Sequence, residues 1–137
     1  MEDLHFCWEN LTIACTECNR RKNDYYEVGN EFLDPYIDDV ENMLEHHGPL
    51  VLWVNGNVRA ETTVRTLELH SHIRKELITR KIGKIGDFNN LLERYLAEGD
   101  YILKGLLGRQ VKEMMGKYSE YSAMLVGVFS NKGITIE

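Results

Sequence analysis

The sequence has no long apolar run, little proline and few cysteines, and each shortage counts against a class of protein. No stretch approaches the roughly 20 apolar residues of a membrane-spanning helix, so we expect no membrane segment. The opening MEDLHFCWEN lacks the basic start and apolar core of a secretory signal peptide. Three cysteines, an odd number, argue against a disulfide framework and indicate a reducing, cytoplasmic setting.

Positive charge is also scarce. The 137 residues carry 16 Lys and Arg against 22 Asp and Glu, which gives a formal net charge of −6. This balance counts against a protein that coats nucleic acid through its overall charge, although a local basic face can still do that work. One basic group is the Arg-Arg-Lys run at 20–22. A second spans 74–84 and suits a DNA-facing helix or a solvent-exposed face equally well; it contains Arg74, Lys75, Arg80, Lys81 and Lys84.

The local patterns at the start of the chain predict a strand followed by a helix. Apolar residues alternate in NLTIAC at 10–15, as they do in a half-buried strand. Thr16 is a typical N-cap residue, and it predicts a helix from 17 to 24. Six acids and no Lys or Arg lie between Glu31 and Glu45, and a short acidic helix is expected at 40–46.

Farther along, a hairpin and then several helices are expected. Asn55-Gly56 lies between two β-rich runs and suits a type I′ turn, which predicts a β-hairpin over 50–61. Apolar residues then recur mostly at three- and four-residue steps, as on amphipathic helices. The helices expected are 67–85, weakened near its end by Gly83 and Gly86, then 88–97, 101–117 and the apolar segment 121–129. The predicted fold class is α+β.

The stretch ENLTIACTECNRRK at 9–22 resembles the second half of the HNH, or ββα-metal, endonuclease motif. The segment FLDPYIDD, the expected hairpin and the final YSAMLVGVF are similar to HNH nucleases of bacterial phage-defence and retron-associated systems. Such nucleases often work beside an ABC-type ATPase. The resemblance implies a partial ββα-metal unit at 1–39, and a hairpin with a mostly helical region at 40–137 within the same compact unit.

The resemblance also implies roles for individual residues. Asn10 matches the asparagine that orients the catalytic histidine, and Asn19 matches a ligand of the catalytic metal ion. An amide oxygen suits Mg²⁺ or Mn²⁺, which would polarise the phosphate. Lys22, with Arg20 and Arg21, would bind DNA phosphates. Each has a structural alternative: Asn10 as a loop-closing side chain, Asn19 as a polar residue of the first turn, and the basic run as a solvated helix face.

Cys15 and Cys18 have the spacing of half a four-ligand zinc site. The resemblance places a second cysteine pair upstream, and this sequence has none. His5 and Cys7 are the residues at hand that could complete a set of three cysteines and one histidine. The alternative is that both thiols pack as small apolar side chains.

The first half of the motif is not found in residues 1–9. In the similar nucleases it carries Asp-His or Glu-His, whose histidine is the general base, whereas His5 is the single histidine before Asn10. A general base must reach its proton, so we expect weak or absent cleavage by this chain alone. Three explanations stay open: a truncated or mis-started product of an HNH gene, a decayed nuclease kept for binding, and a partner protein that supplies the missing first strand.

Three functions therefore remain under consideration. The first is an impaired, metal-dependent DNA endonuclease that hydrolyses phosphodiesters in phage defence. The second is a non-catalytic binding module that docks an ATPase partner or nucleic acid. The third is a zinc-stabilised structural protein.

Overall fold

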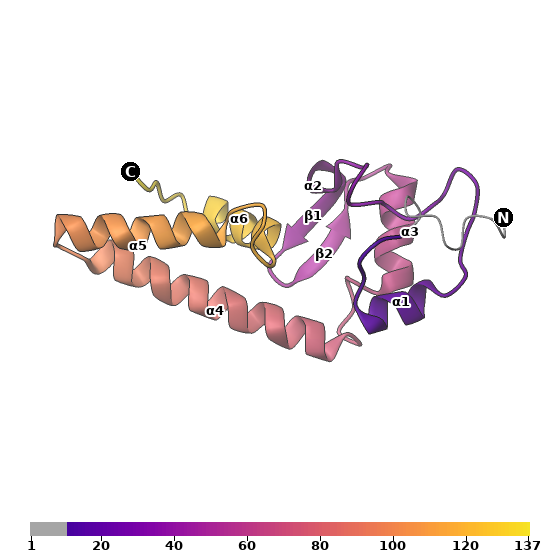
Figure 1. Cartoon of the computed structure of the whole chain (residues 1–137), viewed down its shortest axis with the longest axis horizontal. Coiled ribbons are helices and arrows are strands. Elements are labelled where there is room, and N and C mark those ends of the chain that lie inside the picture. Colours follow the sequence, from indigo (N-terminus) through magenta and orange to yellow (C-terminus); the bar gives the residue numbers. More distant parts are fainter. Residues whose placement is uncertain (1–10) are drawn as a thin grey trace.

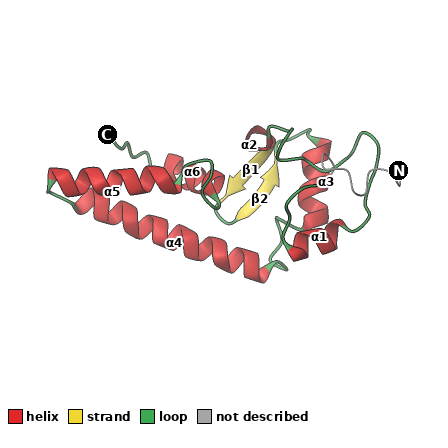
Figure 2. Ribbon diagram, viewed as in Figure 1, coloured by secondary structure: helices red, strands yellow, loops and turns green. Residues whose placement is uncertain are grey.

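The computed structural model describes residues 11–137, and Figures 1 and 2 show how its helices and strands are arranged. Helices α1 and α3 and a two-stranded sheet form one end, while α4 and α5 form a long helical arm with α6 beside its base. The elements are α1 (Thr16–Lys22), α2 (Val40–Met43), β1 (Leu44–His47), β2 (Leu50–Trp53), α3 (Val58–Leu67), α4 (Lys75–Ala97), α5 (Tyr101–Met114) and α6 (Ser122–Asn131). This mixture confirms the α+β class.

The hairpin is present, but its predicted position is wrong. Strand β2 pairs antiparallel with the preceding β1, so that Leu44 lies opposite Trp53 and His47 lies opposite Leu50. The turn between them contains Gly48, whose φ of 58° is easy for glycine. The segment expected as an acidic helix at 40–46 is thus divided between α2 and β1.

Asn55-Gly56 leads into a helix instead of a second strand. The side chain of Asn57 accepts a hydrogen bond from the backbone N–H of Ala60 at 2.9 Å and caps the start of α3. Ala60, Thr63 and Val64 are buried at the three- and four-residue spacing of a helix. This helical period and its cap outweigh the turn signal.

The predicted strand at the start of the chain is also wrong for the residues that can be compared. Residues 11–15 have no regular structure, and the side chains of Leu11 and Ile13 are 51% and 91% exposed. Within 11–137 no strand lies beside them, and an unpaired strand leaves its backbone groups without a ladder. Helix α1 begins at Thr16, with Cys15 as its N-cap, one residue earlier than expected.

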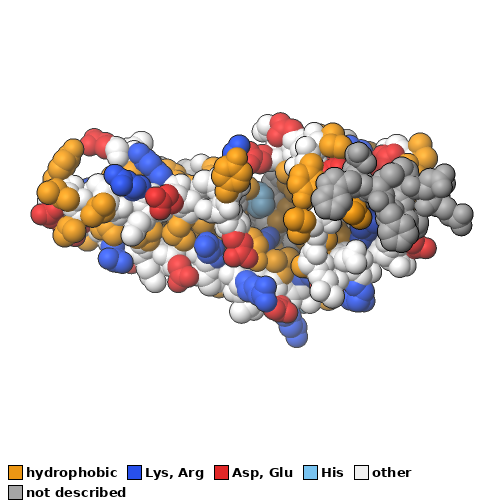
Figure 3. Space-filling model, viewed as in Figure 1, with side chains coloured by type: hydrophobic (Ala, Val, Ile, Leu, Met, Phe, Trp, Pro, Cys, Tyr) orange, Lys and Arg blue, Asp and Glu red, His pale blue; other side chains and the backbone are white. Residues whose placement is uncertain are grey.

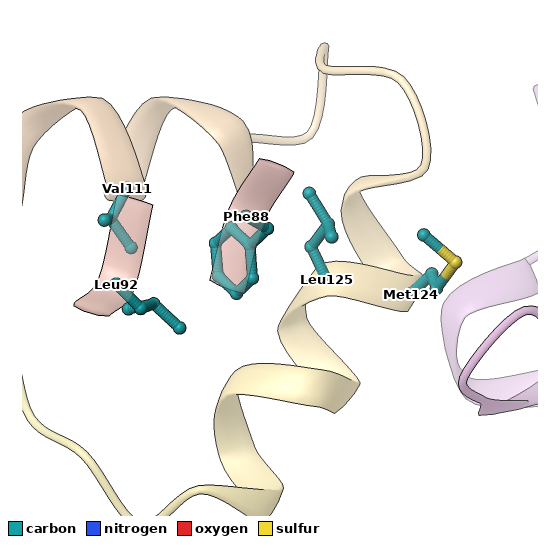
Figure 4. Close-up of a cluster of buried hydrophobic side chains, with 5 residues drawn as sticks. All are labelled: Phe88, Leu92, Val111, Met124 and Leu125. Atoms are coloured by element: carbon teal, nitrogen blue, oxygen red, sulfur yellow. The ribbon is translucent and has the colours of Figure 1, made fainter. Parts of the chain in front are cut away.

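Residues 75–85 of the helix expected at 67–85 join the helix expected at 88–97 in one 23-residue helix, α4. The predicted start is wrong, because Leu67 ends α3 and residues 68–74 form the turn between α3 and α4. Gly83 and Gly86 lie inside α4, exposed, at a cost of roughly 1 kcal/mol each relative to alanine. The helix persists because its inner face is continuous and packs against α5 and α6. That contact contains the core in Figure 4, made of Phe88, Leu92, Val111, Met124 and Leu125.

Along 11–137 the structure contains no helix with both the length and the apolar character needed to cross a bilayer. Helix α4 is long enough in residues, but basic and acidic side chains interrupt it throughout. Its buried apolar residues are Phe88, Leu92 and Tyr95.

Arg59 of α3 holds the loop that precedes α2. Its guanidinium donates two hydrogen bonds to the carboxylate of Asp38, both at 2.9 Å. It also donates to the backbone carbonyls of Glu31 and Phe32, at 3.0 and 2.9 Å. Through these bonds one side chain fixes the path of the loop between α1 and α2.

Replacing Arg59 tests this anchor. We expect Arg59→Met to lower the free energy of unfolding by on the order of 2 kcal/mol, because a carboxylate and two carbonyls lose their donor. Chemical denaturation at neutral pH measures the change. The matched control is Arg80→Met, whose exposed pair with Glu76 should contribute little. Equal losses in the two variants would contradict the anchoring role.

The same pair predicts a pH dependence. The hydrogen bonds from Arg59 hold the pKa of Asp38 below its usual range. A carboxyl with a lowered pKa in the folded state stabilises the fold above its unfolded pKa, and this stability is lost as the pH falls toward the folded value. Between neutral pH and about pH 3, the wild type should therefore lose more stability than Arg59→Met. Parallel acid titrations of the two proteins measure this difference.

Candidate functional site

Helix α1 presents two different faces. Lys22 lies four residues after Cys18 and three after Asn19, so its side chain is a neighbour of both on one side of the helix. Glu17 and Arg21, also four residues apart, share another face. The helix packs against α3, so the site residues predicted at 15–22 are brought together on a supported element.

The second face is held by ion pairs. The carboxylate of Glu17 accepts hydrogen bonds from Arg20 and from Arg21, each at 2.7 Å. These bonds lower the pKa of Glu17 to about 2, with Arg20 as the main cause. Arg21 also pairs with Glu68, the residue that follows α3. Arg20 and Arg21, predicted to bind phosphate, are thus already paired with carboxylates here.

The first face is open to solvent at its outer end. Asn19 and Lys22 are both exposed, and no side chain within residues 11–137 pairs with either. Side chains at this spacing lie about 5–6 Å apart at Cβ. Asn19 and Lys22 are therefore neighbours on α1, and both side chains are exposed.

The inner end of that face meets a buried cation. Arg74, only 7% exposed, precedes α4 and donates a 2.7 Å hydrogen bond to the carbonyl of Leu67. Its second terminal nitrogen lies 3.5 Å from the sulfur of Cys18 and 3.8 Å from that of Cys15. The prediction for Arg74 named only a helix face, so this contact with the thiols is new.

The two thiols have different surroundings. A hydrogen bond from the backbone N–H of Cys18 lowers the pKa of Cys15, and the Arg74 guanidinium lowers it further. Burial raises the pKa of Cys18. The alternative that both thiols pack as core side chains fails for Cys15, because it is exposed.

Within 11–137 no three His, Cys, Asp or Glu side chains come together to hold a metal ion. Zinc in a structural site takes four ligands, of which Cys15 and Cys18 are two. The guanidinium of Arg74 adds positive charge beside both sulfurs. These residues alone do not make a zinc site, and the expected completing residues His5 and Cys7 lie outside the described range.

A magnesium site needs fewer protein ligands than a structural zinc site. It retains several waters and binds through one or two protein oxygens, so the exposed amide of Asn19 is compatible with it. Asn10, the other asparagine of the motif, lies outside the described residues.

The basic stretch at 74–84 is only partly available to DNA. Arg74 and Lys81 are buried, and Lys81 donates to the carbonyl of Pro49 at 3.3 Å. Burial lowers the pKa of Lys81. The interpretation of the whole stretch as a DNA-facing or solvent face is therefore wrong for these two residues: Arg74 is buried just before α4, and Lys81 lies on the inner side of that helix.

Comparison with known proteins does not identify a family. No family model, curated protein or solved structure matches this chain. The HNH resemblance thus depends on the motif residues themselves, and the activity it implies is a proposal.

The thiol environment predicts unequal reactivity. At neutral pH we expect iodoacetamide to alkylate Cys15 before Cys18, because the thiolate is the nucleophile and Cys15 has the lower pKa and the greater exposure. Peptide mapping by mass spectrometry distinguishes the two. Arg74→Met should slow the labelling of Cys15. Arg80→Met should not, because Arg80 is exposed and pairs with Glu76, with no contact to either sulfur described within 11–137. Faster labelling of Cys18 would contradict the described geometry.

Proposed function

We propose that this chain is a subunit of a metal-dependent DNA endonuclease of the HNH lineage. The main support is the open face of α1, on which Asn19 and Lys22 are exposed one turn apart. The opposite face is held by Glu17, Arg21 and Glu68. A fixed helix with a free amide and a free ammonium suits phosphodiester binding, because positioning accounts for much of the barrier reduction in such reactions.

Each residue of this proposal has a separate task. Asn19 would hold a Mg²⁺ or Mn²⁺ ion, and such an ion, when bound, stabilises charge on the phosphate and on the leaving oxygen. Lys22 binds a phosphate oxygen of the DNA backbone as a point charge. Asn10, by resemblance, orients the histidine base. We assign the base to none of residues 11–137.

The second candidate is a nucleic-acid-binding module without cleavage. In its favour, Arg20 and Arg21 are paired with Glu17 and Glu68. Within 11–137, Lys22 is the cation of α1 that can bind a phosphate without breaking an ion pair. An ABC-type ATPase partner and a role in phage defence are further parts of the proposal, supported by the resemblance alone.

Plasmid nicking tests the endonuclease. With Mg²⁺ or Mn²⁺ we expect slow conversion of supercoiled plasmid to the open circle, abolished by a chelator. Asn19→Ala should reduce the rate at least tenfold through the loss of a metal ligand, and Lys22→Ala should weaken DNA binding severalfold. Lys132→Ala, an exposed lysine that follows α6, is the matched control and should leave both unchanged.

The two candidate functions give different results. Metal-dependent nicking that is lost in Asn19→Ala supports the endonuclease. DNA binding that depends on Lys22, with no nicking at any protein concentration, would replace it with the binding module. If the protein neither binds nor nicks DNA, both candidate functions are ruled out.

A further inference from the structure

The two cysteines within residues 11–137 lie at the start of α1 and share a partner. Cys15 is the N-cap of the helix, and its sulfur accepts a hydrogen bond from the backbone N–H of Cys18 at 3.3 Å. One terminal nitrogen of Arg74 lies 3.8 Å from the sulfur of Cys15 and 3.5 Å from that of Cys18. Because both sulfurs contact the same nitrogen, they lie on the same side of the first turn. The two thiols also interact with each other.

The backbone between these cysteines has the geometry that a disulfide needs. The carbonyl of Cys15 accepts a 2.9 Å hydrogen bond from the backbone N–H of Asn19, as in the first turn of an α-helix. The rise and radius of the helix place the Cα atoms of residues three apart about 5 Å from each other. Disulfides join residues whose Cα atoms are about 4.4–6.8 Å apart. The two sulfurs can therefore be joined by rotation of the side chains, with the backbone as it stands.

The two thiols differ in their access to solvent. Cys15 is exposed, whereas Cys18 is partly buried. On the face shown in Figure 3, basic and acidic side chains are intermixed along α4. A charged reagent meets no surface of a single sign there, so exposure of the sulfur decides which thiol reacts. A dissolved oxidant thus reaches Cys15 first, and Cys18 is the neighbour that can complete the reaction.

Arg74 holds the sulfur pair against the rest of the fold. It is 7% exposed and also donates to the carbonyl of Leu67 at 2.7 Å. Figure 1 shows α1 beside the turn that joins α3 to α4, where these contacts are made. Within 11–137 no further His, Cys, Asp or Glu joins the two cysteines in a metal-binding group. In this part of the chain, the chemistry open to the pair is that of two neighbouring thiols.

We propose that Cys15 and Cys18 form a reversible redox site that reacts with low-molecular-weight disulfides. The deprotonated sulfur of Cys15 attacks one sulfur of the small disulfide, whose S–S bond breaks. A mixed disulfide forms on Cys15, and the released thiolate takes up a proton. The sulfur of Cys18 then gives up its proton, attacks the sulfur of Cys15 and expels the second small thiol. Two protein thiols are thereby oxidised to one disulfide, and one small disulfide is reduced to two thiols.

An excess of small thiol reverses both steps, so a reducing compartment keeps the pair as thiols. Disulfides in such a compartment are usually transient and act in catalysis or redox sensing. The proposal does not depend on the nuclease proposal, because it concerns only the two sulfurs and the groups that hold them.

Glutathione disulfide tests the site on the full chain in a Cys7→Ser background, which leaves Cys15 and Cys18 as the cysteines. With a chelator present, we expect the folded protein to lose both free thiols without retaining glutathione. Peptide mapping by mass spectrometry should place the new bond between Cys15 and Cys18, and dithiothreitol should restore both thiols. Cys18→Ala should stop at a mixed disulfide on Cys15, because no second thiol can displace the glutathione. Cys15→Ala should react about tenfold more slowly, because its remaining thiol is partly buried.

The same reactions in denaturant are the control, since two nearby cysteines can also react in an unfolded chain. Closure of the bond from the mixed disulfide should be about tenfold faster in the folded protein, because the helix turn holds the sulfurs together. Circular dichroism of each reduced variant checks that it is folded. A mixed disulfide that persists in the presence of Cys18, attack at Cys18 before Cys15, no reaction, or closure no faster than in denaturant would overturn the proposal.

Discussion

The contact of Arg74 with two thiols and a backbone carbonyl is the constraint on which the candidate site depends. One guanidinium connects the start of α1 at Cys15 and Cys18, the end of α3 at Leu67, and the first turn of α4. Burying a charged guanidinium without hydrogen-bond partners costs free energy, so Arg74 can be buried here only because it makes these bonds. The orientation of α1, and hence the direction in which Asn19 and Lys22 point, follows from this contact and from the pairing of Arg21 with Glu68.

The parts of the fold that depend on local periodicity could be predicted, and those that depend on a partner segment could not. The helical period on each side of Gly83 and Gly86 was visible in the sequence, but the helix was predicted to break there. It continues because inner-face burial outweighs the intrinsic cost of the two glycines. The strand at 50–53 was predicted but its partner was not, because pairing to the preceding residues 44–47 is a tertiary choice. The strand at 10–15 was predicted from alternation alone, and alternation cannot show whether a neighbouring strand exists.

In the candidate site, too, local features could be predicted from the sequence and contacts with distant residues could not. The motif at 15–22 was identified from the sequence, and a Glu17–Arg21 pair is readable from its four-residue spacing. The contacts with Glu68 and Arg74 come from residues about 50 positions away, and no local pattern contains them. One signal was nevertheless present. Arg74 and Lys81 continue the spacing of Ile78, Ile85 and Phe88, which places both cations on the inner face of α4, where each must find an acceptor.

In the proposed function, the open face of α1 binds a divalent cation and a nucleic-acid phosphate. Amide chemical shifts measured by NMR during titration with a short DNA duplex and Mg²⁺ test it residue by residue. We expect the largest changes at Asn19, Lys22 and their neighbours in α1, and we expect them only when both DNA and Mg²⁺ are present. Changes confined to the α4–α5 arm, or none at saturating DNA, would contradict it.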